Sequence, residues 1–316
     1  MNAAQNGRRP PLNILVTGIS GYLGSLVAPR LVREGHSVRG FARDSRRVTA
    51  EVPVVEGDAV SGAGLERALD GIDVAYFLIH SMEAAVDQDR FAVRERTAAD
   101  RFAQAARNSG VKRIVYLGGL VPADGPHSEH LASRLEVERI LLEAIPESVA
   151  LRASIVIGAR SRSFAFLVRL VERLPVLALP AWRSHRTAPI DERDMVSLLV
   201  AAAGSDKVAG RSLDVAGPDV VSYGELIDRI ADLMLVCRPA VRFKRLTATP
   251  IASRIAAVIA GEQPELIEPL MESLESDLLP RDGKAAKLLA VRLHSLDAAI
   301  EHSLRDWEAT QELAAR

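Results

Sequence analysis

The chain has 316 residues, a mass of 34.1 kDa and a formal net charge of -1. This length can bury one large α/β domain with an appended lobe, and the near-neutral charge gives no basic excess for binding nucleic acid. A single cysteine, Cys237, excludes an internal disulfide and a cysteine-based metal cluster, and no metal ligands are assigned. We expect a cytoplasmic protein without a membrane span, because no run is apolar for about 18 residues and no signal-peptide segment precedes the first predicted strand.

The first predicted element is a buried strand that ends in a glycine-rich turn. Residues 12–24 read LNILVTGISGYLG, with Gly18, Gly21 and Gly24 spaced three apart. A strand that turns sharply into a helix leaves the first helical amides unpaired above the end of the strand, where a pyrophosphate fits. The stretch indicates a dinucleotide-binding loop, with an ordinary glycine-rich turn as the alternative. The expected cofactor contacts in it are Thr17, Gly18, Ser20, Gly21, Tyr22, Leu23 and Gly24.

The end of the second predicted strand, residues 37–42, bears on the choice of nucleotide. NAD sites usually carry a carboxylate there for the ribose 2′-hydroxyl, whereas NADP sites carry an arginine. Arg43 follows this strand, and its planar guanidinium suits a 2′-phosphate. Asp44 comes next and would suit NAD. The sequence favours NADP(H) over NAD(H), with a solvated turn as the alternative role of Arg43.

Two further strands are predicted at residues 52–55 and 73–79. Asp58 and its neighbour Ala59 follow the first of them. Asp58 either accepts a hydrogen bond from the adenine amino group or caps the next helix. The second strand is continuously apolar, as in a parallel sheet buried on both faces. The residues at its end, Ile79, His80 and Ser81, are therefore predicted to lie at the ligand-binding edge of the sheet.

Strands and helices then alternate along the chain. Helices are predicted at residues 89–108 and 127–145, and strands at residues 113–117 and 149–152. This order predicts an α/β fold, a Rossmann doubly wound parallel sheet.

Beyond residue 158 the pattern becomes mainly helical. The elements predicted there are helices at 163–174, 191–203 and 223–234, a short strand at 187–190 returning to the sheet, a strand-like segment at 241–246, and amphipathic helices that include 266–274. We expect residues 10–158 to form an NAD(P)-binding Rossmann domain, to which 186–216 returns. Residues 159–316 are expected to form a smaller, mainly helical C-terminal substrate-binding lobe.

With these motifs, the chain resembles the short-chain dehydrogenase/reductase superfamily. It is most similar to the atypical, extended members that are grouped with epimerase-like and NmrA-like NAD(P)-binding proteins. The resemblance covers residues 12–216 well and includes YLGGL from Tyr116 and LRASIVIG up to Gly158. It implies that Gly118, after the fifth strand, and Ser154, after the sixth, lie beside the cofactor.

The usual catalytic residues of this superfamily are replaced in this chain. Active members use a serine after the fifth strand and a Tyr-x-x-x-Lys on the next helix, where an offset of four places both side chains on one face. The positions four before the five lysines are Asn108, Ala203, Ala240, Pro280 and Gly283, so the motif is absent. On the matching helix the pair reads His130 and Arg134, and the serine position falls at Gly118 or Gly119.

Two interpretations of the replaced pair remain open. In the first, His130 donates a proton, since an imidazole near pKa 6.5 can protonate an alkoxide, and Arg134 holds the nicotinamide ribose. In the second, His130 is a surface residue and Arg134 pairs with Glu138. His80 and Tyr116 are further candidates for catalytic polar groups at strand ends.

The leading hypothesis is an NADP(H)-dependent oxidoreductase of a small, largely apolar carbonyl or alkene substrate. The alternative is a non-catalytic NAD(P)-binding redox sensor or complex-stabilising protein, because the binding loop is kept while the triad is lost. A sugar-nucleotide epimerase ranks lower, since that reaction needs the missing tyrosine. The resemblance also allows a homodimer through the helices at residues 89–108 and 127–145.

Overall fold

The computed structural model describes residues 10–79, 88–122, 125–126, 128–173, 177–179, 181–236, 240–242 and 276–310. Its centre is a seven-stranded sheet in the order β11-β6-β5-β4-β1-β2-β3, with every neighbouring pair parallel. The strands are β1 (Asn13–Thr17), β2 (Ser37–Ala42), β3 (Val54–Glu56), β4 (Val74–Phe77), β5 (Arg113–Gly119), β6 (Val149–Ala153) and β11 (Arg211–Val215). The strand order reverses between β1 and β4, which is where open α/β sheets bind ligands. The predicted Rossmann fold is confirmed.

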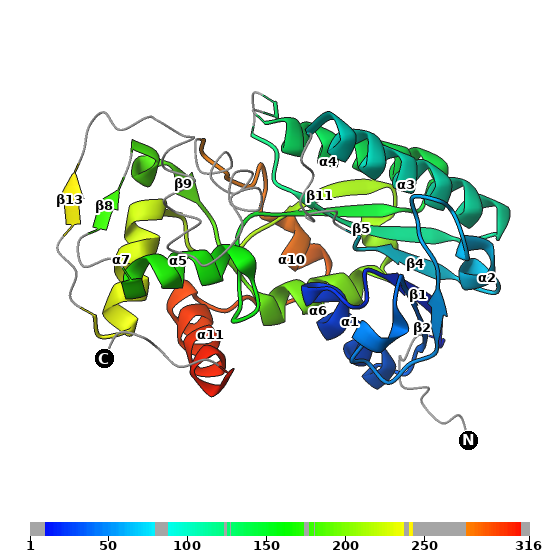
Figure 1. The fold of residues 1–316 in the computed structure, drawn as a ribbon, viewed down its shortest axis with the longest axis horizontal. Helices are drawn as coiled ribbons and strands as arrows, with labels where there is room; N and C mark the ends of the chain where they lie inside the picture. Colours follow the sequence, from blue (N-terminus) through cyan, green and yellow to red (C-terminus); the bar gives the residue numbers. More distant parts are fainter. Residues whose placement is uncertain are drawn as a thin grey trace, which may run out of the picture.

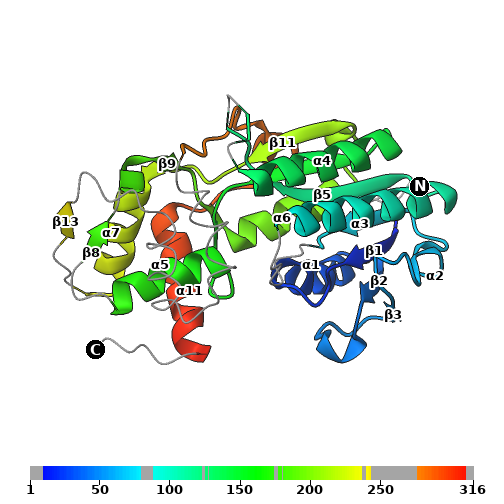
Figure 2. The same ribbon diagram turned by 45° about the horizontal axis from the view of Figure 1, so that its top comes forward.

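Helices cover both faces of the sheet (Figures 1 and 2). On one face α1 (Tyr22–Arg33), α6 (Glu192–Ala202) and α10 (Lys284–Leu288) share an apolar core with the strands. On the other face lie α2 (Leu65–Leu69), α3 (Gln88–Asn108) and α4 (Glu129–Ala144). β4 is buried along its whole length, as its continuous apolar sequence predicts. The helix α1 continues through Pro29.

A second apolar core lies in the C-terminal lobe, beside the carboxyl edge of the sheet (Figure 1). Its helices are α5 (Arg162–Arg173), α7 (Tyr223–Leu233) and α11 (Leu296–Thr310). Short pairs of strands accompany them: β7 (Val156–Ile157) with β10 (Ile190–Asp191), β9 (Arg186–Thr187) with β12 (Val221–Ser222), and β8 (Leu177–Leu179) with β13 (Ala240–Arg242). Three 3₁₀ turns complete the described elements: η1 (Ser45–Arg47), η2 (Ala181–Ser184) and η3 (Asp206–Val208).

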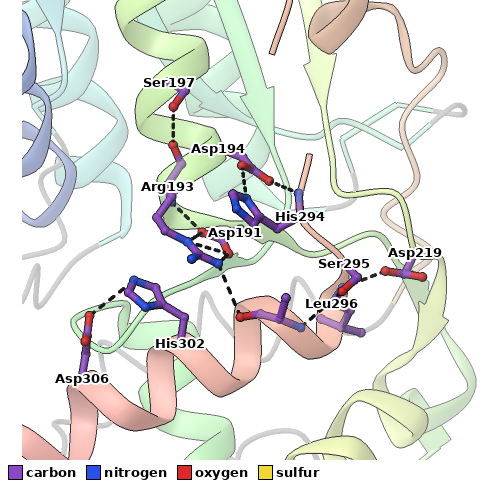
Figure 3. Close-up of polar contacts among 11 residues, drawn as sticks. Asp191, Arg193, Asp194, Ser197, Asp219, His294, Ser295, Leu296, His302 and Asp306 are labelled. Atoms are coloured by element: carbon purple, nitrogen blue, oxygen red, sulfur yellow. Dashed lines mark hydrogen bonds and ion pairs between the residues drawn. The ribbon is translucent and has the colours of Figure 1, made fainter. Parts of the chain in front are cut away.

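Carboxylates of the Rossmann part hold the segment that leads into α11 (Figure 3). Buried Asp194 accepts hydrogen bonds from the His294 backbone amide at 2.7 Å and contacts its ring Nδ1 at 2.6 Å. Asp214 accepts from the Arg281 backbone amide at 2.7 Å and from two guanidinium nitrogens at 3.1 Å. Residues 281–291 thus pack on the Rossmann core, and the lobe begins again with α11.

One prediction about the later part of the chain needs correction, and one strand of the sheet was not predicted. The segment 187–190 does not rejoin the central sheet, because its backbone pairs with Val221 on one side and Val156 on the other. The seventh strand is instead β11, which the sequence patterns did not single out. The predicted helix at 266–274 and most of the strand-like 241–246 lie outside the described residues. None of the helices described is both long and apolar enough to span a bilayer.

Candidate cofactor and substrate site

The glycine-rich loop joins β1 to α1 at the reversal of strand order. Gly18 has a φ of +67°, and a Cβ atom on it would lie 2.4 Å from the Leu78 carbonyl oxygen just after β4. A Cβ on Gly24 would lie 2.2 Å from the Gly18 carbonyl oxygen. The buried Thr17 hydroxyl donates to the Tyr76 carbonyl at 2.8 Å. The loop is therefore held against the ends of β1 and β4, and neither glycine can accept a side chain without moving backbone.

The first turn of α1 is open to an anion. Gly21 is its N-cap residue, with extended backbone and no side-chain cap, and the turn contains no acidic residue. Such a helix start carries partial positive charge and amides without intrahelical partners, which suit a phosphate. Ser20 and Gly21 are exposed, and Leu23 is half-buried. This cradle fits the pyrophosphate of a dinucleotide.

Tyr22 connects this loop to α6. Its hydroxyl donates to Glu192 at 2.5 Å, and a Cβ on Gly158 would lie 1.9 Å from that hydroxyl oxygen. Burial and then the Glu192 charge raise the pKa of Tyr22, so the phenol keeps its proton. Burial also raises the pKa of Glu192. Ligand atoms of Glu192, His302 and Asp306 lie within 4.8 Å of one another. Tyr22 is thus bonded to α6, a contact 170 positions away that no local pattern indicates.

The end of β2 places an exposed arginine beside a carboxylate that is already bonded. Arg43 is exposed directly after the strand. Asp44 accepts from the Arg46 backbone amide at 3.0 Å, from its Nε at 2.9 Å and from its Nη2 at 3.0 Å. These hydrogen bonds hold the pKa of Asp44 below its usual range. The carboxylate that would favour NAD is therefore engaged by its own neighbour.

Asp58 lies at the end of β3, beside buried Ala59. Its Oδ1 accepts from the Val60 amide at 3.1 Å. The next helix, α2, starts after Gly64, which is its N-cap residue. Asp58 therefore does not cap α2, and its contact with adenine stays a prediction.

The residues after β4 are described only as far as Ile79. This residue is half-buried, and its amide nitrogen would lie 3.1 Å from a Cβ on Gly18. The structure thus places Ile79 next to Gly18 of the glycine-rich loop, and its contact with a cofactor stays a prediction. His80 and Ser81 lie outside the described residues.

Hydroxyl groups meet at the end of β6, where Ser154 was expected beside the nicotinamide. The Ser154 Oγ lies 2.8 Å from the buried Thr187 Oγ1 and also accepts from the Ile155 amide at 2.5 Å. Gly118 is buried within β5, and a Cβ on it would lie 3.0 Å from the Tyr116 ring. Thr187 is a polar group of this edge that sequence reasoning missed, because its partner is 33 residues away.

His130 lies in the first turn of α4, which Ser128 caps through the Leu131 amide. Its ring stacks on Phe91 of α3, with centroids 5.5 Å apart. Burial, and then the charge of Arg134, lower the pKa of His130 to about 3. The expected imidazole near pKa 6.5 is therefore replaced by a ring that is neutral at pH 7. The main cause of this lower pKa is the burial of the ring in the folded chain, which a single sequence does not show. A catalytic role of His130 stays a prediction.

Arg134 and Tyr116 meet inside the α4 side of the sheet. Arg134 is only 8% exposed, so it is not part of a solvated helix face. Its backbone carbonyl accepts from the Tyr116 hydroxyl at 3.2 Å. Tyr116 lies in the middle of β5, is 1% exposed, and its pKa is raised by burial. Glu138, the alternative partner of Arg134, is bonded by Arg152 at 2.7 Å.

Comparisons with known proteins agree with this geometry. Residues 18–151 match the family model described as NAD(P)H-binding. UDP-glucose 4-epimerase from Thermotoga maritima has a TM-score of 0.74 at 15% identity, with 95% of this chain and 100% of that chain covered. WbmG of Bordetella bronchiseptica, solved in complex with NAD, has a TM-score of 0.72 at 17% identity, with 98% and 97% covered. The predicted resemblance to NAD(P)-binding proteins is confirmed over residues 18–151, and the two solved structures share the fold of the whole chain.

Of three similar proteins with a named function, two are reductases and one is a subunit of an NADH dehydrogenase. The (4-alkanoyl-5-oxo-2,5-dihydrofuran-3-yl)methyl phosphate reductase of Streptomyces griseus is 29% identical over 94% of this chain and 96% of its own length. The divinyl chlorophyllide a 8-vinyl-reductase of Cucumis sativus is 26% identical, over 69% of this chain and 57% of that protein. Subunit 9 of the NADH dehydrogenase (ubiquinone) 1 alpha subcomplex of Arabidopsis thaliana is 24% identical, over 79% and 64%.

Proposed function

We propose that the protein is an NADP(H)-dependent reductase of a small, largely apolar substrate that carries a carbonyl or an alkene. The observation that carries the proposal is the uncapped start of α1, led by Gly21, at the reversal of strand order. Two relatives named above are reductases, and the one from Streptomyces griseus aligns over nearly the whole of both chains. A bound nicotinamide would supply or accept the hydride.

The residues of the chain would bind and orient the reactants. The amides of the first α1 turn hold the pyrophosphate, and Ser154 and Thr187 offer hydroxyls at the nicotinamide end. His130, which its lowered pKa keeps neutral at pH 7, would donate a hydrogen bond to the substrate oxygen. The C-terminal lobe, with its own apolar core, covers the substrate and excludes water.

We also propose that Arg43 selects NADP over NAD. Arg43 is exposed at the end of β2, and Asp44 is bonded by Arg46. Loss of a charge-assisted contact with the 2′-phosphate weakens binding by about 10- to 100-fold. In Arg43→Ala the Kd for NADPH, measured by fluorescence titration, is expected to rise by this factor while that for NADH stays constant. The matched control is exposed Arg47→Ala, with both constants unchanged. An equal loss for both nucleotides in Arg43→Ala contradicts the assignment.

A panel of enones, aldehydes and ketones tests the reductase proposal. Substrate-dependent oxidation of NADPH, with reduced product identified by mass spectrometry, is the expected result. Failure of the protein to bind either nucleotide would refute it.

The second candidate is an NAD(P)-binding protein without turnover. Absence of the Tyr-x-x-x-Lys pair favours it, and one relative is a subunit of a respiratory complex. Deuteride transfer from labelled NADPH to any product excludes this candidate, whereas tight nucleotide binding without transfer across the panel supports it.

A further inference from the structure

Arg183 lies where the lobe turns back towards the Rossmann sheet. It belongs to η2, and the chain continues into β9, whose Thr187 hydroxyl lies 2.8 Å from that of Ser154. Four residues of extended chain span at most about 14 Å. The backbone of Arg183 is therefore within about 14 Å of the backbone at Thr187, a reach that suits one small molecule.

The guanidinium of Arg183 is buried at one nitrogen without a partner. Its Nη1 has almost no exposed surface and no hydrogen-bond acceptor within the part of the chain described. The side chain packs on the first turn of α7, because a Cβ on Gly224 would lie 3.1 Å from its Nε. Arg183 as a whole is half-buried, and its charged Nη1 has lost its hydrogen bonds with water without gaining an acceptor, which is unfavourable. The positive end of α7 adds to this cost.

The carboxylates of this corner are bonded to other groups. Asp277 accepts from the Arg186 backbone amide at 2.6 Å and from its Nη2 at 2.7 Å. Glu225 accepts from the Ser222 amide at 2.7 Å in a capping box. Both acids are thus bonded to other groups, and neither accepts a hydrogen bond from Arg183 Nη1.

We infer that Arg183 binds an anionic group of the substrate, a phosphate ester or a carboxylate. The inference rests on the proposed function, since it places the substrate between the nicotinamide end and the lobe. The substrate then combines a reducible carbonyl or alkene with an oxyanion at its other end. The planar fork of a guanidinium matches two oxygens of such a group.

Calorimetric titration of the full chain tests this with inorganic phosphate and with acetate, at constant ionic strength set by chloride. Saturating NADP⁺ keeps the probes out of the glycine-rich loop. The variants are Arg183→Gln and, as the matched control, Arg162→Gln, an exposed arginine in α5 of the same lobe. Phosphate or acetate binding is expected to weaken at least tenfold in Arg183→Gln and to stay constant in Arg162→Gln. The ratio of the Kd values for phosphate and acetate shows whether Arg183 prefers a phosphate ester or a carboxylate.

Thermal unfolding supplies a second measurement. Without phosphate, the Tm of Arg183→Gln is expected to equal or exceed that of the wild type, because a buried guanidinium nitrogen without an acceptor is removed. Phosphate should raise only the Tm of proteins that keep Arg183. A lower Tm for Arg183→Gln, equal probe binding in both proteins, absence of probe binding to the wild type, or equal binding of chloride overturns the inference.

The same titrations separate this inference from the proposed function. The NADP⁺ Kd should be unchanged in Arg183→Gln. If the wild type does not bind NADP⁺ or NAD⁺, the proposed function fails, and phosphate titration without nucleotide still decides whether Arg183 binds an anion.

Discussion

The protonation state of His130 decides which chemistry His130 and Arg134 of α4 can perform. Burial and the Arg134 charge lower the pKa of His130 to about 3. At pH 7 the protonated ring is then present in about one molecule in ten thousand, against about one in four for an unperturbed imidazole. The lowered pKa therefore makes the neutral ring the predominant form at pH 7, and a neutral hydrogen-bond donor fits this state better than a cationic proton donor.

Nuclear magnetic resonance measures this without a known substrate. The chain has seven histidines, and the signal that disappears in His130→Gln identifies His130. We expect its ring protons to show no titration between pH 8 and pH 5. A midpoint between pH 6 and pH 7 would refute the reasoning and restore the proton-donor mechanism.

The same pKa predicts how stability depends on pH. The folded pKa of about 3 lies below the unfolded value near 6.5, so the unfolded state binds more protons between these values. The stability that the neutral His130 contributes is fully present above pH 6.5. It declines by about 1.4 kcal/mol for each pH unit below that value, or by about 2 kcal/mol at pH 5. In urea unfolding, the free energy of the wild type should therefore fall relative to that of His130→Gln by about 2 kcal/mol as the pH falls from 7 to 5. A difference in free energy that is constant across this range contradicts the assignment.

Three further predictions concern the contact of Tyr22 with Glu192, the buried pair of Glu138 and Arg152, and the contact of Asp194 with His294. In Gly158→Ala the new Cβ would lie 1.9 Å from the Tyr22 oxygen and 2.0 Å from Glu192, so we expect a loss of about 1 to 3 kcal/mol in unfolding free energy and weaker NADPH binding. Gly283→Ala, where nothing lies within 4 Å, is the control, and equal behaviour of the two variants would contradict the geometry. Glu138→Gln breaks a buried pair with Arg152, at 5% and 8% side-chain exposure, and should cost about 3 kcal/mol of stability in urea unfolding; a change under about 1 kcal/mol rejects the pair. Asp194→Ala removes both bonds to His294 and should speed hydrogen exchange over residues 291–296 while leaving β4 protected. Unaltered exchange there would show that other contacts hold the segment.

The Rossmann core can be predicted from short stretches of sequence, because the burial of β4 and the geometry of the glycine-rich turn each leave a pattern within a few residues. β4 is buried on both faces, so its sequence is a continuous apolar run. The glycine-rich turn carries its own geometric requirement, since Gly18 has a positive φ and Gly24 touches backbone. These two features identify the strand, the turn and the helix without any distant partner.

The remaining parts depend on partners far along the chain. β11 contains buried Asp214, which Arg281 bonds from 67 residues away. The segment 187–190 looks like a strand of the central sheet, and its pairing with Val221 and Val156 is fixed by tertiary contacts. The ring of His130 likewise stacks on Phe91, which lies on a different helix. A short sequence window contains none of these partners.

Three consecutive residues at the start of α6 join the loop to the C-terminal segment. Glu192 accepts from Tyr22 of the loop. Arg193 donates to the Ala298 carbonyl at 3.4 Å, and Asp194 bonds His294 (Figure 3). One turn of helix thus contacts both the proposed pyrophosphate site and the entry to α11. Since α11 contributes to the core of the lobe, a shift of Tyr22 on nucleotide binding would act on the lobe through α6. Nucleotide binding that slows exchange in α11 of the wild type but not of Tyr22→Phe is the result that this linkage requires.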